Sequence, residues 1–222
     1  MTHLLITLAH DPTVRPASTE IAKHMQTRAV ELYTAFLDDS IALATHINHA
    51  TISLIVHDTS LLPEYTRYTG EIEITNVPNM SQATLAQEVA LALASGPVLL
   101  FGGDMPHLPL WRLRDTLTHL QNGVDLVIGS GEQGDWYLIG LRMAHPALLR
   151  NLPLSGAAPD DLCIAAATHG LRVEQLPPWY TLRTMSDLNR LADDLRTMPH
   201  DVAPQSRIFL TASETLSRAV GY

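Results

Sequence analysis

Apolar residues recur along the chain in two patterns that alternate: short continuous runs and stripes at helical spacing. The short runs predict buried β-strands, and the strict alternation in Glu71-Ile72-Glu73-Ile74-Thr75 predicts a half-exposed or edge strand. The stripes predict amphipathic helices. Strands are expected at residues 3–9, 51–57, 71–75, 98–102, 125–129, 136–141 and 172–176. Helices are expected at 18–45, either as one helix or with a restart after residues 38–40, and at 81–93, 110–120, 160–169 and 186–195. This order predicts a three-layer α/β/α, Rossmann-like fold with a mostly parallel sheet.

Residues 1–196 are expected to form a single domain, because no internal repeat, low-complexity segment or linker interrupts the pattern. The tail, residues 197–222, has a different character. Pro199 and Pro204 precede Thr211-Ala212-Ser213-Glu214, which is typical of a capping box that opens a short helix. We expect this tail either to pack on the domain or to reach a second subunit in a homodimer.

Composition narrows the classes of partner. The net charge of -9, with no basic run longer than two residues, argues against a nucleic-acid surface and against a polybasic membrane contact. A nucleotide stays open as a ligand, since a metal and backbone amides can hold its phosphates. Cys163 is the only cysteine, which excludes an internal disulfide and a thiolate metal cluster. No apolar stretch approaches the roughly 20 residues of a membrane helix, so a soluble, cytoplasmic protein is the simplest expectation.

The first candidate for chemistry is Asp104, which follows the apolar run 98–101 and the pair Gly102-Gly103. Ligands of α/β sheets gather just past the carboxyl ends of strands. The two glycines allow a close backbone approach, and a carboxylate at this place suits a hard divalent cation. Two interpretations remain open: Asp104 is a metal ligand, or it caps the helix that begins near Leu108 or closes an Asx turn. His107 could add a ligand or a proton-transfer group.

The second candidate is the turn from Gly129 to Asp135, which joins two predicted strands. It carries Gln133, Gly134 and Asp135, and its glycines would let a ligand approach. Trp136 and Tyr137 follow directly and could stack on a base or a sugar. The alternative, about equally favoured, is a flexible hairpin-like turn with two half-buried aromatic residues.

The third candidate is the loop after the first strand, which commonly holds phosphates in doubly wound folds. Ala9, His10 and Arg15 are the residues there that could contact a nucleotide. The loop lacks the glycines and the lysine of a phosphate cradle, which favours a structural interpretation of this segment.

Three stretches carry a resemblance to a known family. The segment Gly102-Gly103-Asp104-Met105-Pro106-His107-Leu108 matches G-x-D-x-P-x-L in full, and Asp125-Leu126-Val127-Ile128-Gly129-Ser130 follows D-V-V-L-G-P. The segment from Gln133 to Leu141 follows D-G-G-Y-Y-L-I-G-L. The chain thus resembles the bacterial glycosyltransferase-A-like, or nucleotide-diphospho-sugar transferase, proteins of unknown function. These are relatives of 2-phospho-L-lactate guanylyltransferase and of the molybdenum cofactor nucleotidyltransferases. The match covers the second half of the chain well and the first half only by the order of its elements.

The chain also departs from that pattern. Gln133 stands where the family has its first acid of the turn, and Asp135 stands where it has a glycine. The family's D-V-D-T-P-E-D-L reads Thr181-Leu182-Arg183-Thr184-Met185-Ser186-Asp187-Leu188, so both leading aspartates are gone. The loop at residues 10–16 lacks the family's V-K-T-R-L. Of the family's acids, Asp104 survives, and Asp135 could substitute for the lost acid of the turn.

The resemblance implies a metal-dependent nucleotidyltransferase or glycosyltransferase that acts on a nucleotide or nucleotide-sugar donor. Asp104 would coordinate Mg²⁺ or Mn²⁺ on the donor's phosphates, with Asp135 as the second catalytic acid. The segment from Gln133 to Trp136 would shape the acceptor side. The alternative is a degenerate member that binds a nucleotide or a partner protein without turnover, as the missing acids suggest.

Overall fold

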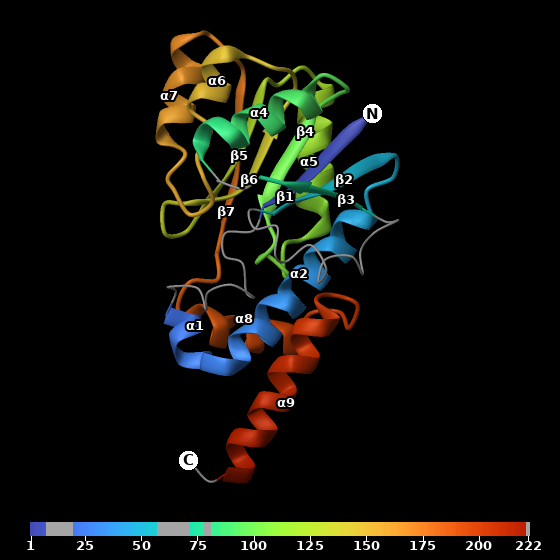
Figure 1. Ribbon diagram of the computed structural model, residues 1–222, viewed down its shortest axis with the longest axis vertical. Helices are drawn as coiled ribbons and strands as arrows, with labels where there is room; N and C mark the ends of the chain where they lie inside the picture. The colour runs from blue at the N-terminus through green and yellow to red at the C-terminus, as the bar shows by residue number, and fades with distance from the viewer. Residues whose placement is uncertain (8–19, 57–71, 78–80, 221–222) are drawn as a thin grey trace.

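The computed structural model describes residues 1–7, 20–56, 72–77 and 81–220. This part of the chain contains a seven-stranded sheet in the order β3-β2-β1-β4-β6-β5-β7 (Figure 1). The strands are β1 (Thr2–Thr7), β2 (Ala50–Val56), β3 (Glu73–Asn76), β4 (Val98–Gly102), β5 (Leu126–Gly131), β6 (Trp136–Leu141) and β7 (Val173–Trp179). β3 is an edge strand, as its alternating sequence predicts.

One strand reverses the direction of the sheet. β6 runs antiparallel to its neighbours β4 and β5, and the other strand pairs are parallel. Residues 132–135 form a hairpin-length connection between β5 and β6, and so short a connection cannot join parallel strands. The prediction of a mostly parallel sheet is confirmed. The reversal also brings the amino end of β6 beside the carboxyl end of β4, where Phe101 lies opposite Leu138.

Helices cover both faces of the sheet. They are α1 (Glu20–Met25), α2 (Ala29–Thr45), α4 (Gln82–Leu93), α5 (Leu110–Gln121), α6 (Pro146–Arg150), α7 (Asp160–Thr168), α8 (Met185–Thr197) and α9 (Pro204–Val220), with a 3-10 turn at Gln26–Arg28. Leu37 of α2 and Leu113 of α5 pack on one face, and Leu85 of α4 and Leu162 of α7 pack on the other. Burying one such leucine stabilises the fold by about 2 kcal/mol. The three-layer prediction is confirmed.

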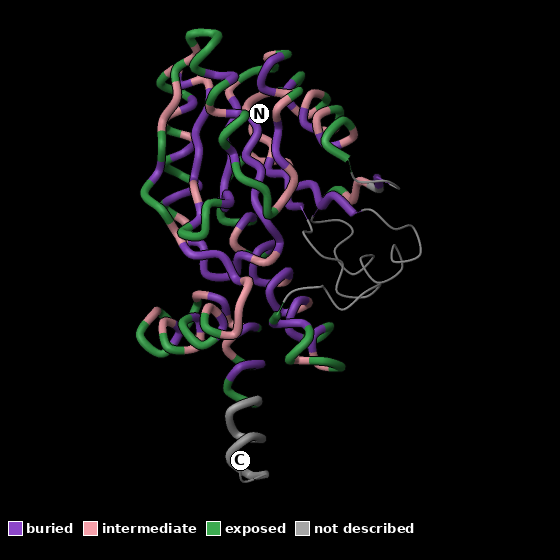
Figure 2. The backbone as a smooth tube through the Cα atoms, turned by 90° about the vertical axis from the view of Figure 1, so that its left-hand side faces the viewer, coloured by how far each residue is buried: buried purple, intermediate pink, exposed green. Residues whose placement is uncertain are grey.

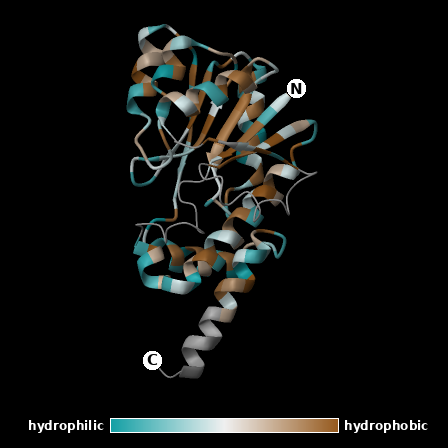
Figure 3. Ribbon diagram, viewed as in Figure 1, coloured by the Kyte–Doolittle hydropathy of each residue, from teal (hydrophilic) through white to brown (hydrophobic). Residues whose placement is uncertain are grey.

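The two colourings of the molecule show the same layering. In Figure 2 the strands are mostly buried, and exposed residues lie on the outer turns of the helices. In Figure 3 the strands of the sheet are largely hydrophobic. Among the described residues, no helix is both long and apolar enough to cross a membrane.

A further group of helices lies below the carboxyl ends of the strands in Figure 1. Here α1, the amino-terminal half of α2, α8 and α9 share a core that includes Phe36, Leu191 and Phe209. Tyr180 and Leu182, from the chain that leaves β7, are buried in the same core. The exit from β7 is therefore held between the sheet and this helical group, which fixes the position of the residues that follow it.

The last helix differs from the expectation for the tail. α9 begins at Pro204, before the capping box expected at Thr211, and extends to Val220. The buried Asp39 of α2 caps its first turn: Oδ1 accepts a hydrogen bond from the Gln205 amide at 3.0 Å, and Oδ2 accepts one from the Ser206 amide at 2.8 Å. The helix is thus longer than predicted and packs on α2 of its own chain. A homodimer stays a prediction.

Two smaller differences concern the start of α8 and the presence of α6. α8 is capped by Thr184, which shares a capping box with Asp187, and not by Ser186 as the sequence suggested. α6 was not predicted, because Pro146–Arg150 is too short to show a helical period.

Candidate active site

A cavity of about 160 Å³ lies where β4 and β5 end and β6 begins. It is lined by Gly102, Asp104 and Met105 after β4, Asp135 and Trp136 at the start of β6, Ser155 and Gly156 between α6 and α7, and Thr181, Leu182 and Arg183 after β7. The fold therefore brings Asp104 and Asp135, the two predicted catalytic acids, to one cavity. This is the edge of an α/β sheet where ligands are expected.

Asp104 is half-buried in the turn after β4. Its carboxylate lies over Gly102, because a Cβ added there would come within 2.4 Å of Asp104 Oδ1. It does not cap the next helix: α5 begins at Leu110, with Pro109 at the N-cap position and no side-chain cap. The interpretation of Asp104 as a helix cap is wrong. Burial raises the pKa of this carboxyl to about 6. A hydrogen bond from the residue's own backbone amide and the Arg183 guanidinium oppose the rise, and the Asp135 carboxylate adds to it.

Asp135 is almost fully buried and pairs with Arg183 from the loop after β7. Arg183 donates to Asp135 Oδ2 from Nε at 2.9 Å and from Nη2 at 2.6 Å. Asp135 Oδ1 is also buried, and no hydrogen-bond partner for it lies among the described residues. A Cβ at Gly131 would come within 1.9 Å of this oxygen. The carboxylate can therefore adopt this position only because residue 131 is a glycine.

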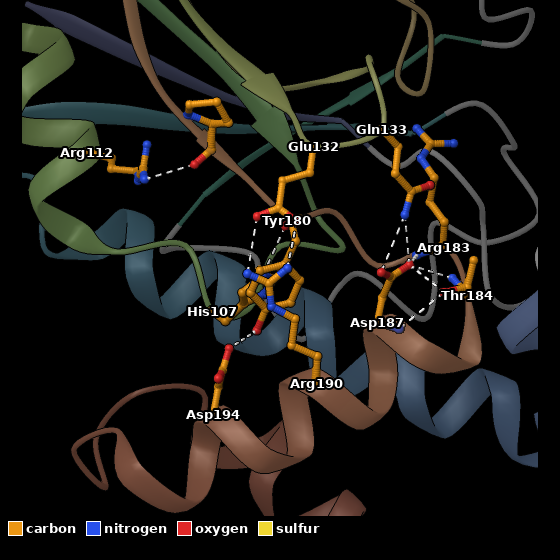
Figure 4. Close-up of polar contacts among 11 residues, drawn as sticks. His107, Arg112, Glu132, Gln133, Tyr180, Arg183, Thr184, Asp187, Arg190 and Asp194 are labelled. Atoms are coloured by element: carbon orange, nitrogen blue, oxygen red, sulfur yellow. Dashed lines mark hydrogen bonds and ion pairs between the residues drawn. The ribbon is translucent and has the colours of Figure 1, made fainter.

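The backbone of Arg183 is held in turn by Asp187 at the start of α8 (Figure 4). Asp187 Oδ2 accepts hydrogen bonds from the amides of Arg183 at 3.1 Å and of Thr184 at 2.8 Å. Partial burial raises the pKa of Asp187, but these hydrogen bonds outweigh it and hold the pKa below its usual value. Asp187 is thus a positioning residue for Arg183.

The donor set does not fit a resident divalent cation. The part of the chain that the structure describes contains no group of three or more His, Cys, Asp or Glu side chains able to hold a metal. Asp104 and Asp135 supply two carboxylates, and Arg183 already occupies one oxygen of the second. A cation that arrives on the phosphates of a nucleotide needs fewer protein ligands. For that case, Asp104 as the ligand of Mg²⁺ or Mn²⁺ stays a prediction.

Other predicted site residues have structural contacts of their own. Gly103 donates its amide to the Thr7 carbonyl at 2.8 Å and accepts from Ser40 Oγ at 3.2 Å. Gln133 points to α8, where its Nε2 donates to Asp187 at 3.2 Å (Figure 4). Gly134 has positive φ, and it is not among the lining residues. Only Gly102 and Trp136 of the predicted nucleotide contacts line the cavity; Ala9, His10 and Arg15 lie outside the described residues.

The two aromatic residues at the start of β6 are buried and not half-buried as suggested. Trp136 is 4% exposed, and its Nε1 donates to the Leu154 carbonyl at 3.0 Å, which holds the loop of Ser155 beside the cavity. Tyr137 faces the core against Arg112, and its hydroxyl donates to the Pro177 carbonyl at 3.0 Å. Tyr137 therefore cannot stack on a ligand in the cavity.

His107 is likewise part of the core and not of the cavity. Its ring stacks on Trp179, and its Nε2 lies 3.2 Å from the Tyr180 carbonyl. Burial lowers the pKa of His107 to about 3, so the ring is neutral and unsuited to proton transfer near neutral pH. The suggestion that His107 assists Asp104 as a ligand or a proton-transfer group is not supported.

Sequence reasoning missed the third charged group of the site, Arg183. It lies in the stretch 181–188, which the resemblance marked only for the aspartates it lacks. Ser155 and Gly156 were also missed, since a short turn of small residues has no distinguishing pattern. Gly156 has a φ of +86°, and a Cβ there would come within 2.9 Å of Arg183 Nη2.

The chain is similar to known proteins in part of its sequence and in its fold. A model of the bacterial family described as "Uncharacterized protein conserved in bacteria (DUF2064)" matches residues 79–156, roughly a third of the chain. This segment contains Asp104, Asp135 and Ser155. No curated protein sequence matches the chain.

Solved structures match over nearly the whole chain. A protein of Desulfovibrio desulfuricans G20, provisionally assigned as a nucleotide-diphospho-sugar transferase, is similar with a TM-score of 0.82 and 21% identity, over 98% of this chain and 97% of that one. A nucleotidyl transferase from Methanothermobacter thermautotrophicus has a TM-score of 0.57 and 16% identity, over 89% and 99%. A cytidylyltransferase from Leptospira borgpetersenii has a TM-score of 0.56 and 11% identity, over 96% and 95%.

These likenesses define the class of fold. The chain has the α/β/α fold of the nucleotide-diphospho-sugar transferase type, which confirms the fold implied by its sequence motifs. The family model covers residues 79–156 only, and the solved structures are similar to the chain in fold.

Proposed function

We propose that the cavity beside Asp104 binds the phosphate-bearing part of a nucleotide or nucleotide sugar, and that the chain transfers a nucleotidyl or glycosyl group from it. One observation carries this proposal: Asp104, from the turn after β4, and Asp135, from the connection between β5 and β6, lie with Arg183 in one cavity at the carboxyl ends of β4 and β5. Fold alone does not define an activity, but a carboxylate pair and a guanidinium at this edge of the sheet are suited to a phosphorylated ligand.

The roles of the residues follow from their chemistry. An oxygen of the acceptor attacks the donor's phosphorus in nucleotidyl transfer, or its anomeric carbon in glycosyl transfer, and the bond to the phosphate leaving group breaks. Asp104 accepts the proton of the acceptor hydroxyl, since a carboxyl with a pKa of about 6 is suited to that task. The leaving phosphate departs on the side of Arg183. Mg²⁺ or Mn²⁺ at Asp104 stays a prediction; when bound, such an ion would neutralise charge on the leaving group.

A second candidate function is ligand binding without turnover. The observation that favours it is the small number of acidic residues in the cavity. Asp135 forms an ion pair with Arg183, which leaves Asp104 as the one carboxylate among the lining residues without an ion-pair partner. Binding and turnover need separate measurements to decide between the two functions.

Binding is tested by thermal shift with nucleoside triphosphates and nucleotide sugars, each with EDTA, Mg²⁺ or Mn²⁺. We expect at least one nucleotide to raise the Tm. If none does under any of these conditions, both functions are wrong for this cavity.

Turnover is tested by incubating the stabilising nucleotide with the protein and following its cleavage by chromatography. Asp104→Asn should abolish cleavage and keep the thermal shift. Asp115→Asn, which changes an exposed carboxylate on α5, is the matched control and should behave like the unmodified protein. Binding without any cleavage would favour the second candidate.

A further inference from the structure

We propose that Arg183 is the cationic ligand-binding residue of this cavity, and that its guanidinium contacts the ligand's phosphate so that binding needs no divalent cation. The inference rests on the proposed function, because it presupposes a phosphate-bearing ligand. It goes further by naming the residue and by assigning metal-independent binding where the sequence motifs imply Mg²⁺ or Mn²⁺.

The first argument is the position of the guanidinium. Arg183 lines the same cavity as Asp104 and Asp135, and its side chain is 36% exposed although Asp135 is 5% exposed. The protein thus places a permanent positive charge at the wall of the cavity and leaves part of it accessible. A divalent cation would have to compete with this charge for the Asp135 carboxylate.

The second argument is the number of free donors. A guanidinium carries five N–H groups. Asp135 Oδ2 accepts from Nε and from Nη2, whereas Nη1 has no hydrogen-bond partner among the described residues. A planar guanidinium that is fixed along one edge and free along another is suited to a phosphate, which it can contact through two parallel N–H groups.

The third argument is that the neighbouring backbone makes room for the guanidinium. A Cβ at Gly156 would come within 2.9 Å of Nη2 and 3.2 Å of Nη1. The φ of +86° at this residue is one that side-chain-bearing residues rarely adopt. Asp187 fixes the Arg183 backbone from the other side, by accepting its amide hydrogen bond at 3.1 Å. Three separate segments therefore determine where this cation lies.

The fourth argument is the charge of the cavity. Arg183 and Asp135 neutralise each other, and Asp104 is the one charge that remains among the lining residues. The lining residues thus offer a divalent cation one free carboxylate, that of Asp104. Arg183 is the one positively charged residue among them, so it is the group able to contact a phosphate directly.

The experiment is isothermal titration of the full chain with inorganic pyrophosphate and with UDP, GDP, CDP and ADP, in EDTA and in Mg²⁺ or Mn²⁺. We expect at least one probe to bind in EDTA, with an affinity that the metals change by less than about threefold. Arg183→Gln should weaken binding in EDTA about tenfold or more, which corresponds to about 1.4 kcal/mol. Arg183→Lys should bind with an affinity between those of the unmodified protein and Arg183→Gln, since lysine keeps the charge and loses the planar fork.

Arg142→Gln is the matched control, because Arg142 pairs with Asp125 away from the cavity. It should bind like the unmodified protein. Arg183→Asp should bind only with metal and should show bound Mn²⁺ by electron paramagnetic resonance, because it adds a third carboxylate. Circular dichroism checks that each variant is folded, and the EDTA comparison on the unmodified protein needs no variant.

The outcomes separate this inference from the proposed function. Binding that disappears in EDTA, or that survives unchanged in Arg183→Gln, overturns the role of Arg183 and leaves the proposed function standing. Failure of every probe with and without metal overturns both.

Discussion

Arg183 donates two hydrogen bonds to a single oxygen of Asp135, from Nε at 2.9 Å and from Nη2 at 2.6 Å, inside the cavity that Asp104 also lines. The two residues are far apart in the sequence and come from the loop after β7 and the start of β6. Their contact joins the two halves of the site. Because of this contact, the positive charge of Arg183 contributes to the net charge of the cavity.

Removing the acid of this pair should destabilise the fold. Asp135→Asn leaves Arg183 without its counter-ion in a partly buried place, and we expect the free energy of unfolding to fall by about 1 to 2 kcal/mol, less than for a fully buried pair because Arg183 is partly exposed. Urea denaturation measures the change. Glu132→Gln breaks the more exposed pair with Arg190 and should cost less than about 0.5 kcal/mol. Equal stability of Asp135→Asn and the unmodified protein would contradict the account of this pair.

The glycine beneath Asp135 should matter for binding more than for folding. Gly131→Ala places a methyl group where Asp135 Oδ1 now lies, and the carboxylate must swing away and carry Arg183 with it. We expect ligand affinity to fall at least about fivefold, roughly 1 kcal/mol, with the fold intact. Titration calorimetry and circular dichroism measure the two effects.

Gly134→Ala is the control for that substitution. Gly134 has a φ of +86° but open space around it, so alanine should cost about 1 kcal/mol of stability through backbone strain and leave affinity unchanged. If Gly134→Ala weakened binding as much as Gly131→Ala, the effect would reflect the turn as a whole and not the position of Asp135.

His107 should make the protein sensitive to acid. Its pKa is about 3 when folded against about 6.5 when unfolded, so the unfolded chain binds the extra proton between these values, and stability falls as the pH drops below about 6.5. His107→Gln keeps a donor for the Tyr180 carbonyl and removes the titration. Between pH 7 and pH 4.5 we expect the unmodified protein to lose on the order of 2 kcal/mol more than this variant. If the unmodified protein and His107→Gln lost the same stability between pH 7 and pH 4.5, the ring would not be buried as described.

The docking of α9 should depend on Asp39. Asp39→Ala removes the acceptor for the amides of Gln205 and Ser206 and should cost about 1 to 2 kcal/mol, as the loss of an N-cap does. Hydrogen exchange should accelerate at residues 204–212 and stay unchanged in β4. Uniform acceleration across both would mean that α9 unfolds only together with the sheet.

Much of the fold could be predicted because hydrophobic periodicity records burial. β1, β2, β4 and β5 appeared as apolar runs, and α4, α5 and α7 as stripes, close to their observed bounds. The direction of β6 was left open, since an apolar run has no direction and only the hairpin-like turn, one of two alternatives for this segment, pointed to it. α9 was placed too late in the chain because its true cap, Asp39, lies in another helix.

The part of the site that has a local sequence signal was predicted, and the part that depends on tertiary contacts was not. Asp104 was found because two glycines and a strand end precede it directly in the sequence. The pairing of Asp135 with Arg183 is a tertiary contact, and no local spacing reveals it. The burial of His107 was also not predicted, because the Trp179 and Tyr180 rings that bury it are distant in the sequence.

The central claim, that this cavity holds the phosphates of a nucleotide, is tested most directly by a crystal structure of the protein with the nucleotide that stabilises it in the thermal-shift panel. We predict phosphate oxygens within hydrogen-bond distance of the Arg183 guanidinium, in the space bounded by Asp104 and Gly156. A nucleotide bound elsewhere, for example in the separate cavity lined by His3, Glu73 and Glu88, with the cavity at Asp104 free of it, would contradict the account.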